Sequence, residues 1–155
     1  MISAPIGYEV SNQPGTTNGP ITPAAFDTLV GAGSARSFGF VDGYDVNYDS
    51  TATSESIEVT LFSFHSPAGA AAFTTAAMTQ WEASSLAPAR KTIPAIRGSV
   101  VQVSTKAFDG YYFVDAFAQK GATMMVIEYA NTTKPRELPH GLESAAVSQY
   151  ARLQP

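Results

Sequence analysis

Residues 111–129 read YYFVDAFAQKGATMMVIEY, two apolar segments joined by Lys120-Gly121. Successive side chains of an extended segment point to opposite faces, and here both faces of both segments are apolar. The first segment carries Tyr111, Phe113 and Phe117 on one face and Tyr112, Val114, Ala116 and Ala118 on the other; the second carries Met125, Ile127 and Tyr129 against Met124 and Val126. A strand with one face in water alternates apolar and polar residues, so this hairpin is predicted to be covered on both faces. Its cover is a helix layer on each face, a second copy of the chain or a bound apolar ligand.

Further strands are predicted on both sides of a long helical segment. Residues 100–104 form a strand that leads to the hairpin through Asp109-Gly110, a dipeptide typical of tight hairpin turns. Earlier, residues 38–48 and 55–65 alternate with a period of two and make a second hairpin. Residues 1–21 are expected to hold one short strand, at 6–10, and a mobile connector rich in Asn, Gly and Pro.

Three helices complete the prediction. Thr22-Pro23 and Ser66-Pro67 each place a capping hydroxyl before a proline, the typical start of a helix, and Pro139 precedes a closing helix. The expected order is strand, helix, two strands, helix, three strands, helix. This order predicts a single α+β domain over residues 1–155, with a mainly antiparallel sheet of about six strands packed with three helices.

The composition excludes several classes of protein. Of the 155 residues, 14% are charged, none is cysteine, and the formal net charge is -4. The absence of cysteine rules out disulfides, thiolate zinc sites and iron–sulfur clusters. An acidic chain without a basic patch is not expected to bind nucleic acid.

No catalytic or metal-binding motif stands out, so no catalytic residue, metal or cofactor is expected. The two histidines, His65 and His140, lack metal-ligand spacing, and there is no Gly-x-Ser-x-Gly elbow. The string from Asp45 to Asp49 matches the first three ligands of a calcium loop, but Ser50 replaces the glycine that the loop requires. A catalytic triad assembled in space stays open, because triads are defined by geometry.

Asp115 is unusual because it interrupts an apolar face of the late hairpin. A buried carboxylate needs a partner, and Arg97 or Lys106 is expected to supply it.

Four short strings carry a family resemblance: GFVDGY at 39–44, FHSPAGAAAF at 64–73, IPAIRG at 93–98 and QYARL at 149–153. They resemble secreted or lipoprotein-type actinobacterial envelope domains of unknown function. The order of strands and helices is similar to that of PsbP-like α/β/α sandwiches, which serve as binding or assembly modules. The resemblance implies a secreted or cell-envelope location, with membrane attachment only through a removed anchor; Met1–Pro5 shows no export signal.

We expect a non-catalytic binding or sensor module of the cell envelope, with an apolar cleft between sheet and helices. The cleft would bind an apolar small molecule or a protein partner. Its expected lining residues are Phe62, Phe64, Trp81, Tyr111, Phe113 and Met125. One alternative is a structural domain that forms a homodimer through Tyr112, Val114 and Met124. Another is a hydrolase whose site is assembled around His65 or His140.

Overall fold

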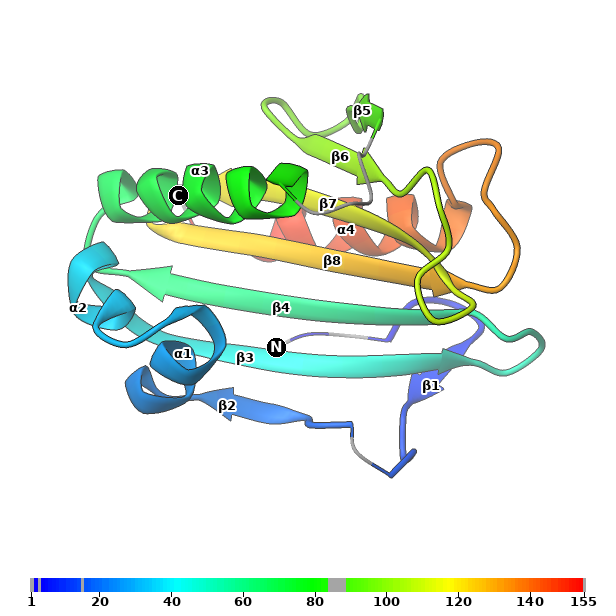
Figure 1. Ribbon diagram of the computed structural model, residues 1–155, viewed down its shortest axis with the longest axis horizontal. Helices are drawn as coiled ribbons and strands as arrows, with labels where there is room; N and C mark the ends of the chain where they lie inside the picture. The colour runs from blue at the N-terminus through cyan, green and yellow to red at the C-terminus, as the bar shows by residue number, and fades with distance from the viewer. Residues whose placement is uncertain (1, 3, 15, 84–88, 155) are drawn as a thin grey trace.

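A computed structural model describes residues 2, 4–14, 16–83 and 89–154. A sheet of eight strands runs through the molecule in the order β1-β3-β4-β8-β7-β6-β5, and β2 also pairs with β3 (Figure 1). The strands are β1 (Tyr8–Val10), β2 (Gly19–Ile21), β3 (Phe40–Ser50), β4 (Ser56–Phe64), β5 (Ala89–Lys91), β6 (Val100–Val103), β7 (Tyr112–Lys120) and β8 (Thr123–Asn131). The helices are α1 (Pro23–Val30), α2 (Ser34–Phe38), α3 (Pro67–Ala83) and α4 (His140–Arg152). All strand pairings among the described residues are antiparallel.

Local sequence sets the ends of several elements. The Thr22 hydroxyl accepts a hydrogen bond from the amide of Ala25 at 3.2 Å, which caps α1 before its first proline. Asp109 and Gly110 both have positive φ, 49° and 83°, in the tight turn that leads into β7. Such turns favour Asp-Gly because few other residue pairs adopt positive φ at both positions.

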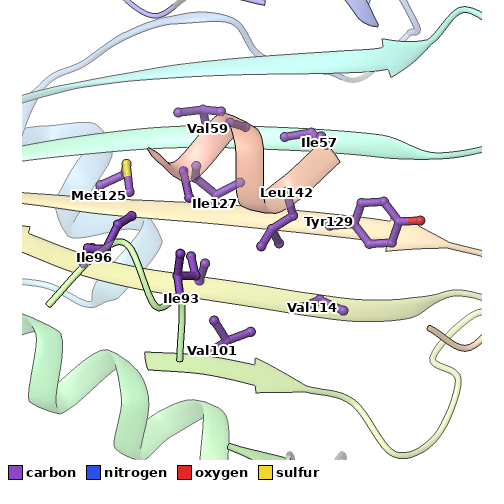
Figure 2. Packing of buried hydrophobic residues seen from close by; sticks show 14 of the residues in the cluster. Ile57, Val59, Ile93, Ile96, Val101, Val114, Met125, Ile127, Tyr129 and Leu142 are labelled. Carbon is purple, nitrogen blue, oxygen red and sulfur yellow. The ribbon is translucent and has the colours of Figure 1, made fainter. Parts of the chain in front are cut away.

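Helices of the same chain lie on both faces of the late hairpin. In Figure 1, α4 lies behind β7 and β8, whereas α3 lies in front of them and α1 and α2 in front of the neighbouring strands. On the α4 face, Val114 of β7 and Ile127 of β8 pack with Leu142 of α4 (Figure 2). On the other face, Phe117 of β7 packs in a second cluster with Phe73 of α3. The prediction of a doubly covered hairpin is confirmed, and the cover at these positions comes from the chain itself.

The predicted α+β class and the order of the long elements are confirmed. The sequence prediction lacked β2, β5 and α2, which span 3, 3 and 5 residues. Such short elements have no detectable periodicity and form because a neighbouring strand or helix supplies their partners. The first of them, β2, lies within the segment that was expected to be a mobile connector.

Candidate functional site

The helices leave part of the α3 face of the sheet open, and two cavities adjoin there. One, of about 810 Å³, lies between α1, β2 and strands β3 and β4. The other, of about 440 Å³, lies between α1, α3 and strands β7 and β8. Leu29 and Val126 line both cavities. We call the two together the groove.

The groove has mostly apolar walls and a largely polar floor. The apolar side chains of the walls are Ile21, Ala25, Leu29, Val30, Phe73 and Ala77, beside the polar Thr17, Asn18, Thr28 and Gln80, and Phe62, Phe117 and Val126 continue the apolar surface onto the sheet. The rest of the floor is made by Asp45, Glu58, Thr60, Asp115 and Glu128. Four carboxyl groups therefore meet apolar surface in one open hollow.

Sheet register explains why the carboxyl groups gather. Glu58 of β4 pairs with Glu128 of β8, and Glu128 pairs with Asp115 of β7. Directly paired residues hold their Cβ atoms about 5 Å apart on one face, so these three side chains form a row across the sheet. Asp45 of β3 lies next to this row, paired with Thr60.

Burial makes the charged form of these carboxyl groups unfavourable. Burial, together with the charges of Asp45 and Glu128, raises the pKa of Glu58 to about 7. Burial also raises the pKa of Asp45 and that of Glu128 above their ordinary range. Opposing this, a side-chain hydrogen bond with Asp115 lowers the pKa of Glu128. Glu58 therefore titrates near neutral pH.

Asp115 occupies an almost fully buried position, with 4% of its surface exposed. The expected partners, Arg97 and Lys106, are exposed. One partner that the structure shows is Glu128, through the side-chain hydrogen bond between the two acids. The acid that interrupts the apolar face thus belongs to the floor of the groove.

The expected lining residues do not share one cleft. Phe62 lines the groove, and Phe64 is buried in the aromatic cluster beside it. Phe113 is half-buried on β7, and Tyr111 is 41% exposed at the turn before it. Met125 is fully buried on the opposite, α4 face. The side chain of Trp81 lies outside the described part of the structure.

The polar floor was missed by sequence reasoning, although a signal was present. Glu58 and Thr60 alternate with Ile57, Val59 and Leu61, a pattern that normally marks a water-facing side of a strand. Only the register with β8 and β7 shows that this side faces a groove lined by further acids.

Two of the three residues proposed for a dimer face, Val114 and Met124, lie on opposite faces of the sheet. Val114 and Met124 are both fully buried, Val114 in the cluster that contains α4 and Met124 in the cluster that contains α1 and α3. A homodimer remains a prediction, and it would need a surface other than these two side chains.

A smaller hollow of about 270 Å³ lies at the start of α4, lined by Glu55, Tyr129, Lys134 and His140 among others. The Glu55 carboxylate accepts hydrogen bonds from Tyr129 at 2.7 Å, from Tyr8 at 3.1 Å and from Asn131 at 3.1 Å. Burial and this carboxylate keep the pKa of Tyr8 above its ordinary range. Glu55 thus joins β1 to β8, which is a structural role.

We expect Glu55→Ala to lower the free energy of unfolding by about 2 kcal/mol, because two phenol groups and one amide lose a shared charged acceptor. Urea denaturation measures the change. Glu9→Ala on the exposed face of β1 is the matched control and should stay within about 0.5 kcal/mol of the wild type. Equal stability of the two variants would contradict the structural role.

The fold and the groove together define a class: an α+β domain with α4 packed on one sheet face and a groove open on the other. No family model matches the chain. No curated protein matches it either. Among solved structures, the extracellular domain of PknH from Mycobacterium tuberculosis is similar, with a TM-score of 0.54 and 10% sequence identity over 97% of this chain and 84% of that chain. The likeness shows a shared fold. None of the described helices is long and apolar enough to cross a membrane.

Proposed function

We propose that this chain is a non-catalytic binding domain, of the kind that serves as a sensor module of the cell envelope, and that its ligand occupies the groove. The observation that carries the proposal is the meeting of apolar walls and convergent polar groups in cavities of about 810 and 440 Å³. Small-molecule sites are typically hollows of about 300–1,000 Å³ with a mostly apolar lining and a few placed polar groups.

The carboxyl groups on the groove floor indicate that the ligand is not purely apolar, as first expected, but also carries polar groups. A purely apolar molecule would displace water from Asp45, Glu58 and Glu128 without offering hydrogen bonds in its place, which is costly. A ligand with an apolar body and hydrogen-bond donors satisfies both surfaces, since carboxyl oxygens accept hydrogen bonds. We therefore propose an amphipathic small molecule.

An extracytoplasmic location is supported by two observations. The fold is shared with a domain described as extracellular. The four short strings noted above resemble actinobacterial envelope domains. We propose that the chain acts outside the cytoplasm.

Filling the groove tests the binding role. Thr28 is an exposed residue of α1 that lines the larger cavity, whereas Ala24, one turn earlier, is exposed and lies outside its lining. We expect native mass spectrometry of protein purified from its own host to show a bound small molecule on the wild type and on Ala24→Trp. Thr28→Trp should lack it, because the indole occupies the cavity.

Two other results would contradict a ligand held in the groove. A bound molecule that remains on Thr28→Trp would place the ligand elsewhere, and wild-type protein that is always empty would contradict a tightly held ligand. Circular dichroism of both tryptophan variants verifies that they fold alike.

A further inference from the structure

One hydroxyl group lies between two carboxyl groups on the groove floor. Thr60 Oγ1 is 3.0 Å from Asp45 Oδ1 and 3.3 Å from Glu58 Oε1. A hydroxyl has a single hydrogen, so it donates to one of these oxygens at a time. The second contact is most favourable when its carboxyl group carries a proton and donates it to the hydroxyl oxygen. The geometry therefore suits two acids that together hold one proton.

The shared proton resides on Glu58. Asp45 receives a second hydrogen bond, at 3.3 Å, from the Asn47 side-chain amide, which stabilises its charged form. Glu58 instead lies between the charges of Asp45 and Glu128, and burial already disfavours its own charge. The lining residues from β2, α1 and α3 that the structure describes include no ionisable side chain. Beyond Glu128 the row continues with Asp115, Gln102 and the backbone position of Arg90 on β5.

The acid pair is connected to a wall of the groove. The Asn47 side-chain amide that donates to Asp45 also donates to the carbonyl oxygen of Thr17 at 3.0 Å, and Asn18 accepts from the Asn47 backbone amide at 2.6 Å. Residues 17–21 form this wall and contain β2, which pairs with β3 over 3 residues. So short an edge strand is among the parts of a sheet that open most easily.

We propose that the proton shared by Asp45 and Glu58 is a switch for the groove: while it is bound, the wall formed by residues 17–21 is held against β3, and its loss releases the wall. When both carboxyl groups are charged, they repel each other, and the repulsion displaces the Asp45 side chain. Asn47 donates both to Asp45 and to the carbonyl oxygen of Thr17, so this displacement is passed to the wall. This inference rests on the proposed function, because it makes access to the binding groove depend on pH.

Amide hydrogen exchange tests the switch. We expect the protection of the Gly19 and Ile21 amides, each relative to an unstructured peptide, to fall about tenfold as the pH rises through the neutral range, a coupling of ordinary size. In Glu58→Gln the glutamine side chain donates a hydrogen bond as the protonated acid does, so the protection of the Gly19 and Ile21 amides should stay constant across the same range. Glu9→Gln, an exposed change on β1, should behave as the wild type.

Two results would overturn the switch: protection in the wild type that does not change with pH, or the same fall in Glu58→Gln. Failure of the switch is distinct from failure of the proposed function. If exchange is independent of pH while Thr28→Trp still loses the bound molecule, the regulation is wrong and the binding role stands. If protection changes with pH but no ligand is found in the groove, the pH switch stands and the binding role is wrong.

Discussion

Phe26→Ala should lower the free energy of unfolding by about 3–5 kcal/mol, the largest single effect that we expect in this chain. Phe26 of α1 has no exposed surface, and its ring stacks on Phe40 with centroids 4.1 Å apart. It also contacts the rings of Phe73 at 5.0 Å and Phe62 at 5.6 Å. Truncation removes these contacts and leaves a cavity beneath the helix that forms one wall of the groove.

Chemical denaturation of Phe26→Ala measures this loss. Phe26→Leu retains most of the volume and should cost less than the alanine variant, which separates cavity formation from a general intolerance of change. Phe108→Ala, at a phenylalanine that is 64% exposed, is the surface control and should change stability by less than about 0.5 kcal/mol. A loss below about 1 kcal/mol in Phe26→Ala would show that the aromatic cluster does not hold α1 on the sheet.

The second large effect is a dependence of stability on pH that comes from Glu58. Its pKa is about 7 in the folded chain, against 4.5 as its ordinary value. The folded state therefore binds this proton more tightly than the unfolded state, so the stabilisation is complete below pH 4.5 and is lost as the pH rises through 7. A difference of this size corresponds to about 3 kcal/mol.

Glu58→Gln isolates that contribution, because glutamine does not titrate. Unfolding free energies measured at several pH values should show the variant gaining on the wild type by about 3 kcal/mol between pH 4 and pH 8. Glu9→Gln should run parallel to the wild type, since Glu9 is exposed. Parallel curves for Glu58→Gln and the wild type would show that Glu58 is solvated and titrates as a free glutamate does.

Much of the architecture was predictable because it depends on patterns within single segments. The cap at Thr22 and the period of two in residues 55–65 correspond to α1 and β4. The turns at Asp109-Gly110 and Lys120-Gly121 correspond to the two ends of β7. Each signal is local, so it needs no knowledge of which strand lies beside which.

The candidate site was predictable only in part. Phe62 was among the expected lining residues and lines the groove. Met125, an equally apolar residue on the neighbouring strand β8, faces α4 instead. A side chain that is apolar on a strand covered on both faces can belong to either core, and composition does not distinguish them.

The sequence by itself determined the class of fold, the order of the long elements, the absence of thiol chemistry and the need to cover both faces of residues 111–129. Only the tertiary structure decided that α4 covers one face and that α1, α2 and α3 cover just part of the other. It also decided that Asp45, Glu58, Asp115 and Glu128 meet on one floor. These four acids come from four strands spread over more than half of the chain, and strand register, a long-range property, brings them together.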